Sequence, residues 1–192
     1  MMKQLSFCFI LLLYTTILFS QDEKPPTYLT IGYLGNVAIH PGGKVGLQLP
    51  LKPVKLFSDE NTSHTLVISP QAATYFRGRR EYALFFQNEV GILRKKEGRN
   101  VSHILGVGLG YLGESILLSE SVSLGTGEIT GSDREWKHFF LPTLNYEIGS
   151  NLGDSLRWYV KAISGPKLGE GRWEVALFVE AGVKLSLKSS NR

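Results

Sequence analysis

The sequence predicts an all-β protein, an eight-stranded antiparallel up-and-down barrel, from three observations. First, apolar and polar residues alternate with a period of two along most of the chain after Pro26. Second, convincing helical periodicity is almost absent from the same residues. Third, shorter and longer connections alternate between the predicted strands, which is typical of a meander whose two ends carry loops of different length.

The first 20 residues are predicted to be a cleaved export signal. Lys3 provides a positive start, and the apolar run 7–19 has the length of a signal-peptide core. It is shorter than the ~20 apolar residues that a membrane-spanning helix needs, although an uncleaved anchor is the alternative. The single cysteine, Cys8, lies within this segment, so the mature chain is not a disulfide scaffold.

The remaining chain is divided into a leading segment at 21–43, a barrel at 44–188 and a tail at 189–192. The predicted barrel strands are 44–51, 65–76, 82–92, 103–111, 117–126, 140–148, 156–162 and 173–188. Residues 28–36 also alternate, but a ninth strand would place the two ends of the meander on opposite sides. We therefore expect 28–40 to lie outside the barrel, followed by a turn at 40–43 that contains Pro41 and two glycines.

The connections predict which side each loop faces. The links 52–64, 94–101, 127–136 and 164–171 are longer than the links 77–81, 113–116 and 150–154 that separate them. Short turns on one side of a membrane and longer loops on the other would produce this pattern. The longer links are therefore expected on the external side.

Two interpretations of the alternation differ in which face meets water. A soluble lipocalin-like barrel has its apolar face inside, whereas an outer-membrane barrel turns that face to lipid. The apolar face carries aromatic residues near strand ends, as expected at a lipid–water boundary, and these predicted interface aromatics are Tyr82, Tyr111, Tyr146, Trp158 and Trp173. The other face combines alternating glycines with a predicted lumen charge network of Glu89, Glu147, Arg157, Lys161, Glu174, Glu180 and Lys184. Small and paired residues suit the narrow interior of an eight-stranded barrel, so the transmembrane β-barrel is favoured.

The stretch HPGGKVGLQLPL at 40–51, the export signal ending near Ser20 and Gln21, and the alternating segments resemble small outer-membrane β-barrel proteins of the Bacteroidota type. The resemblance covers most of the mature chain as a pattern, with only the start of that stretch approaching a motif. It implies an eight-stranded antiparallel barrel of unassigned role. The chain departs from many such barrels by continuing past Leu187 to Arg192 instead of ending on an aromatic residue.

The sequence predicts no catalytic, cofactor-binding or metal site. Ser63 and Ser102 each precede a histidine, but adjacent residues on a strand point to opposite faces. The four histidines are scattered singly, without the local spacing of metal ligands. The net charge of +4 has no clustered basic stripe, so a nucleic-acid partner is not expected.

We therefore expect a non-enzymatic outer-membrane protein that acts as a structural, binding or accessory component through its external loops or leading segment. The expected partners are outer-membrane lipid and lipopolysaccharide, with a membrane protein as a further candidate. The basic loop 94–99 has two interpretations: a contact with anionic sugar phosphates of the outer leaflet, or an ordinary solvated loop. The solvated loop is favoured. Three alternatives stay open: a small-solute or ion path through the lumen, a lipid-modifying enzyme, and a soluble periplasmic lipocalin-like barrel.

Overall fold

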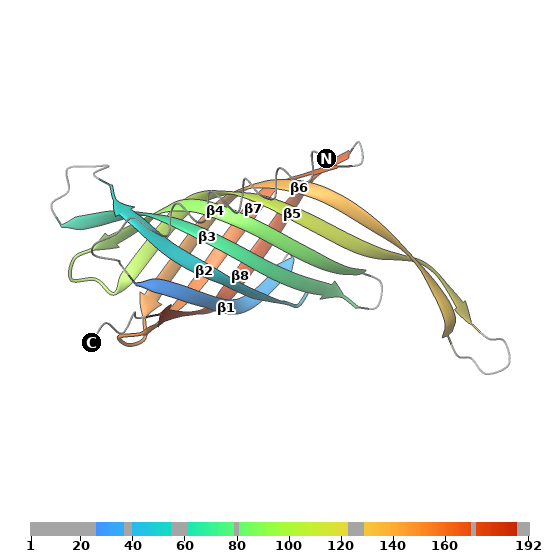
Figure 1. Ribbon diagram of the computed structural model, residues 1–192, viewed down its shortest axis with the longest axis horizontal. Coiled ribbons are helices and arrows are strands. Elements are labelled where there is room, and N and C mark those ends of the chain that lie inside the picture. The colour runs from blue at the N-terminus through green and yellow to red at the C-terminus, as the bar shows by residue number, and fades with distance from the viewer. Residues whose placement is uncertain are drawn as a thin grey trace, which may run out of the picture.

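The computed structural model describes residues 26–36, 40–54, 61–78, 81–122, 129–169 and 172–187. Their regular structure is entirely β (Figure 1). The strands are β1 Thr27–Asn36, β2 Gly42–Pro53, β3 Thr62–Arg77, β4 Glu81–Lys96, β5 Val101–Val122, β6 Ile129–Asn151, β7 Leu156–Gly169 and β8 Arg172–Leu187. The predicted export signal and C-terminal tail lie outside the described residues. No helix in the described ranges is long and apolar enough to cross a membrane.

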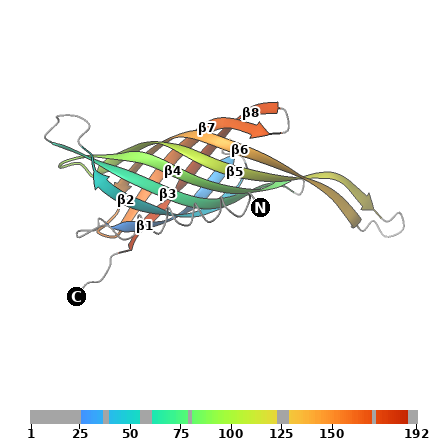
Figure 2. The ribbon, with the colours of Figure 1, turned by 45° about the horizontal axis from the view of Figure 1, so that its top comes forward.

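The eight strands form a closed barrel in which each strand pairs antiparallel with the next, and β1 closes the ring against β8 (Figures 1 and 2). This confirms the predicted fold class. Thr27 pairs with Leu187, so β1 begins where β8 ends. We call this the terminal end of the barrel. The opposite end, marked by the pair Val122–Ile129 of β5 and β6, is called the hairpin end.

The strands are staggered around the ring. Successive partners lead from Asn36 through Phe178, Ile163, Asn145, Gly106, Gly91 and Val67 to Pro50. Because Gln48 pairs with Tyr28, Pro50 is level with Pro26, and the circuit returns to β1 ten residues from its start. With ~3.3 Å per residue and ~4.8 Å between strands, this stagger tilts the strands by about 40° from the barrel axis, as expected for eight strands.

The two faces of the sheet have opposite character. On β5 the outward side chains of Leu105, Val107 and Leu109 are 58%, 60% and 60% exposed. On β8 the inward side chain of Glu180 is 0% exposed. The apolar set therefore lies outside and the charged set inside, and the lipocalin-like alternative, which requires the reverse, is wrong for this chain.

Two strand predictions are wrong, and their effects on the strand count cancel. Residues 27–36, expected outside the barrel, form β1, which pairs with both β2 and β8. The predicted strand 103–111 and the described part of the predicted strand 117–126 form one strand, β5, because the expected turn at 113–116 continues the ladder with β6. Glu114, in the middle of that supposed turn, is a buried inward residue.

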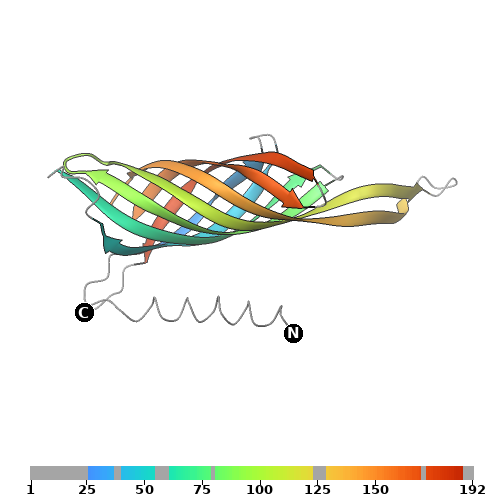
Figure 3. The same ribbon diagram turned by 90° about the horizontal axis from the view of Figure 1, so that it is seen from above.

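The merged strand also changes the predicted sides of the loops. The links from β2 to β3 and from β4 to β5 lie at the terminal end, whereas those from β5 to β6 and from β7 to β8 lie at the hairpin end. The prediction placed all four on one external side. β5 and β6, with 22 and 23 residues, project far beyond the other strands at the hairpin end (Figures 1 and 3).

Candidate functional site

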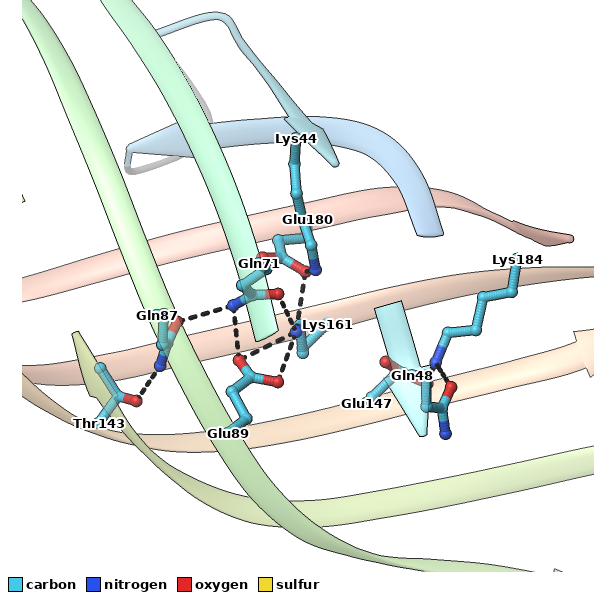
Figure 4. A network of polar contacts seen from close by, with 10 residues as sticks. All are labelled: Lys44, Gln48, Gln71, Gln87, Glu89, Thr143, Glu147, Lys161, Glu180 and Lys184. Atoms are coloured by element: carbon cyan, nitrogen blue, oxygen red, sulfur yellow. Dashed lines mark hydrogen bonds and ion pairs between the residues drawn. The ribbon is translucent and has the colours of Figure 1, made fainter. Parts of the chain in front are cut away.

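Lys161 lies at the centre of a polar network that fills the half of the lumen nearer the terminal end (Figure 4). Its Nζ donates to both carboxylate oxygens of Glu89, at 3.0 and 2.9 Å. The same nitrogen is 3.1 Å from Oε2 of Glu180, which also accepts from Lys44 at 2.5 Å. Lys161 therefore joins carboxylates from two strands. Gln71 also donates to Glu89, at 2.9 Å.

A second group of polar contacts continues the network toward the terminal end. Lys184 donates to Glu147 and to Oε1 of Gln48, the latter at 2.6 Å. Arg157 donates to the hydroxyl of Ser102 and lies over the ring of Tyr28, 5.6 Å from its centroid. These contacts join strands that are not neighbours in the ring, so they fix the barrel across its interior.

The buried charges are balanced. Among the described residues they are four lysines and four glutamates, namely Lys44, Lys161, Lys167, Lys184, Glu89, Glu114, Glu147 and Glu180. Each of the eight takes part in an ion pair. A buried charge is tolerated when it is paired and hydrogen-bonded, so this balance makes the lumen a packed polar core.

An apolar layer closes the lumen on the hairpin side of the network. Its large members are fully buried, and they are Leu34, Tyr75, Phe85, Leu112, Leu141, Ile163 and Phe178. The rings of Phe85 and Phe178 stack at 5.4 Å between centroids. Beyond them Glu114 accepts from Lys167 and, at 2.7 Å, from the hydroxyl of Tyr75. This layer separates the polar network from the hairpin end.

The space inside the network is small. A cavity of about 10 Å³ is lined by Glu89, Glu147 and Lys161 together with Asn145. Both polar atoms of the Asn145 amide are buried and lack a protein partner. This volume is about that of one water molecule, which leaves no room there for an organic substrate. The described residues contain no group of three or more His, Cys, Asp or Glu side chains placed to hold a metal ion.

The structure places the predicted lumen residues in three settings. Glu89, Glu147, Lys161, Glu180 and Lys184 are buried and in contact within the network. Arg157 is half-buried beside Ser102. Glu174 is exposed, because it follows Trp173 near the hairpin end of β8.

Sequence reasoning missed several members of the interior. They are Lys44, Gln48, Gln71, Glu114 and Lys167. The signal was present as inward parity on each strand: Lys44 and Gln48, for example, are four residues apart on β2. It was overlooked because β2 and β3 alternate weakly, and because Glu114 was assigned to a turn.

Four of the five predicted interface aromatics have described side chains, and these four lie on the outer face toward one end or the other. Tyr82 makes an edge contact with Trp136 at 5.1 Å between centroids, and Tyr111 Oη lies 2.6 Å from His138 Nδ1, all toward the hairpin end. Toward the terminal end are Tyr146 and Trp158, 49% and 36% exposed. The backbone of Trp173 in β8 pairs with Leu168 of β7, but the side chain of Trp173 is outside what the structure describes.

The serine–histidine pairs do not form a nucleophilic site. Ser102 points inward, where its hydroxyl is 3.4 Å from the carbonyl of Gly149. His103 points outward, with Nδ1 2.8 Å from Tyr146 Oη. Ser63 is exposed and donates to the carbonyl of Lys95, whereas His64 is buried. In each pair the two side chains are on opposite faces, as the strand geometry requires.

The β5–β6 hairpin has free edges. β4 begins opposite Ile116, through the pair Glu81–Ile116, and β7 reaches β6 only as far as Phe140. Within the described part of the chain, 117–122 of β5 therefore pair with 129–134 of β6 and with no third strand. No third strand of the described residues continues the sheet beside 117–122 or 129–133.

No family model and no curated protein sequence matches the chain. Among solved structures, the chain is similar to the outer membrane protein Ail of Yersinia pestis, whose backbone structure was determined in a phospholipid bilayer nanodisc. The two share 11% sequence identity with a TM-score of 0.35, over 85% of this chain and 100% of Ail.

Proposed function

We propose that this chain is an integral outer-membrane β-barrel that presents its β5–β6 hairpin as a binding element. The observation that carries the membrane part is the outer apolar surface. Leu105, Val107 and Leu109 are consecutive outward residues of one strand, and each is more than half exposed. Soluble proteins rarely expose so continuous an apolar surface, whereas lipid would cover it at no such penalty.

The aromatic residues support the same placement. Tyr111 and Trp136 lie toward the hairpin end, and Tyr146 and Trp158 toward the terminal end, so amphipathic rings border the apolar surface on both sides. A band of apolar side chains between two aromatic girdles is typical of membrane barrels. The projecting hairpin supports an orientation with the hairpin end outside, since external loops are the longer ones. The export signal and the Bacteroidota-type resemblance stay predictions of the sequence.

The filled lumen supports a role without catalysis or conduction. The eight buried charged side chains are committed to ion pairs, and the apolar layer around Phe85 and Phe178 lies between them and the hairpin end. The function is therefore placed outside the barrel. The hairpin is the best candidate, because unpaired strand edges bind extended polypeptides by adding a strand.

The side chains of the hairpin suggest the chemistry of its partner. Leu118 is 57% exposed and offers an apolar contact beyond the barrel rim. Among the hairpin side chains that the structure describes, the exposed charged ones are Glu120, Asp133, Arg134 and Glu135, three acids and one base. We therefore propose that the partner is an extended polypeptide segment carrying apolar and basic side chains.

The membrane part is tested by refolding the purified protein with and without detergent. We expect folding only in detergent or lipid, with a change of gel mobility between unheated and boiled samples. A chain that folds to a soluble monomer without detergent, and whose gel mobility does not change on heating, would falsify the membrane placement.

The binding part is tested with a shortened hairpin. A variant in which residues 118–133 are replaced by Asn-Gly, a dipeptide suited to a two-residue hairpin turn, should keep a heat-modifiable barrel. Detergent-solubilised wild-type protein should bind a subset of an array of synthetic peptides, and the shortened variant should lose that binding. N-methylation of the peptide backbone should weaken binding as well, because strand addition uses backbone hydrogen bonds. Equal binding by both proteins, or no bound peptide, would contradict the role of the hairpin.

A further inference from the structure

A cationic hollow lies on the outer surface at the terminal end, beside the turn from β4 to β5. Its volume is about 360 Å³, and it is lined by Arg94, Lys96, Arg99, Val101 and His103. Arg94 and His103 are direct partners in the β4–β5 register. The turn brings Arg99 back to the end of β4, where its N–H donates to the carbonyl of Lys96 at 3.2 Å. Gly98 allows this turn with a φ of 72°.

The hollow begins where the outer apolar surface ends. The outward residues of β4 run through Phe86 and Val90, both exposed, to Ile92, and the next outward residue is Arg94. On the neighbouring strand, Leu105 is followed in the same way by His103. The apolar side chains thus give way to Arg94 on one strand and to His103 on the next, within a single outward position.

The cations of the hollow are uncompensated. In the described part of the chain, Arg94, Lys96 and Arg99 form no ion pair, in contrast to the lysines of the lumen. The acid of the same turn, Glu97, is exposed and leaves the turn with a net positive charge. His103 adds a further donor: when the hydroxyl of Tyr146 donates to Nδ1, at 2.8 Å, the ring carries its proton on Nε2.

We propose that this hollow binds the phosphate of an anionic phospholipid in the leaflet at the terminal end. A guanidinium group binds a phosphate through paired hydrogen bonds. The hollow contains two guanidinium groups, those of Arg94 and Arg99. The edge of the apolar surface holds the acyl chains of the same lipid while the cations hold its headgroup. The inference rests on the proposed membrane placement, because only a barrel in lipid brings a headgroup to this height.

The test compares two charge-matched double variants of the full-length mature protein in detergent micelles. Arg94→Gln/Arg99→Gln removes two cations from the hollow, and Arg77→Gln/Arg134→Gln removes two from the hairpin end. Native mass spectrometry then follows the titration with phosphatidylglycerol and with phosphatidylcholine. Wild type and the hairpin-end variant should retain phosphatidylglycerol preferentially. The hollow variant should bind it about twenty-fivefold more weakly, since each of the two basic residues at an anionic surface contributes roughly fivefold.

Three results would overturn the inference. One is unchanged retention of phosphatidylglycerol by the hollow variant, and another is an equal loss in both double variants, which would indicate diffuse charge attraction. The third is displacement of the lipid by glycerol phosphate at equal concentration, which would indicate a site for soluble phosphates. A barrel that folds in detergent with heat-modifiable mobility but shows any of these results contradicts only the lipid site. A chain that folds to a soluble monomer without detergent contradicts both the site and the membrane placement.

Discussion

Lys161 on β7 donates to both carboxylate oxygens of Glu89 on β4, at 3.0 and 2.9 Å, across the interior of the barrel. These strands are not neighbours in the ring, so the ion pair is a cross-brace and not part of a ladder. Lys161 also reaches Glu180 on β8, which makes it a shared partner of two buried carboxylates. Its removal would leave Glu89 without a cation.

The first prediction concerns this brace. Lys161→Met should lower the free energy of unfolding by about 3–5 kcal/mol, because it leaves a buried carboxylate uncompensated. Urea unfolding in lipid vesicles, followed by tryptophan fluorescence, measures the change. Glu89→Gln in the same background should recover part of the loss. Arg77→Met is the control: Arg77 is 63% exposed and 3.7 Å from Glu81, so its loss should change stability by ~0–1 kcal/mol. Equal effects of Lys161→Met and Arg77→Met would contradict the brace.

The fold class was predictable because period-two alternation is a local property. The inward or outward assignment of Leu177 and Glu180 follows from parity alone and agrees with their exposures of 43% and 0%. The limits of the strands were not predictable in this way, because they depend on contacts between residues far apart in the sequence. Gly113, Glu114 and Ser115 resemble a turn, but Glu114 accepts from Lys167 of β7, a contact that forms only when the barrel closes. β1 was excluded by a parity argument that depended on that false turn.

The interior site was only partly predictable. Alternation identified Lys161 and Glu180 as inward, but which acid meets which base depends on the stagger of the strands. Lys44 and Glu180 are 136 residues apart and meet at 2.5 Å because the stagger brings β2 and β8 to the same level. No local pattern encodes that stagger. Glu174 is exposed because it lies close to the hairpin end of β8. The alternation of the strand predicts which face a residue is on but not how near it lies to the end of the barrel.

The second prediction concerns a close approach between β6 and β7. A Cβ added to Gly165 would lie 1.9 Å from the carbonyl oxygen of Pro142, a distance that requires backbone movement. Gly165→Ala should therefore destabilise the barrel by about 1–3 kcal/mol, the usual range for overpacking. Gly43→Ala is the matched control, since no heavy atom lies within 4 Å of its added Cβ. Urea midpoints in vesicles compare the two, and equal midpoints would contradict the close approach.

The third prediction concerns conduction. Tyr75, Phe85 and Phe178 are each 0% exposed, so the described side chains of their layer pack across the lumen without contact with solvent. Wild-type protein in a planar lipid bilayer should therefore show no current steps above baseline. A conducting porin of known orientation, measured in the same membrane, verifies the sensitivity of the recording. Reproducible steps from the purified wild type would contradict the closed lumen and favour the transport alternative.

The fourth prediction separates lipid from water on the outer face with two leucines of the same strand. Leu109 and Leu118 are 60% and 57% exposed on β5, so a soluble protein would tolerate a charge at either position equally. In the proposed placement Leu109 faces acyl chains, whereas Leu118 lies on the hairpin beyond the barrel. Leu109→Arg should then lower the free energy of unfolding in vesicles by about 2–4 kcal/mol, and Leu118→Arg should lower it by about 0–1 kcal/mol. Urea titrations in vesicles measure both, and heat-modifiable gel mobility reports whether each variant folds. A difference of less than about 1 kcal/mol between the two variants would contradict a lipid-facing Leu109. The two leucines are almost equally exposed, so a difference in burial cannot account for such a result.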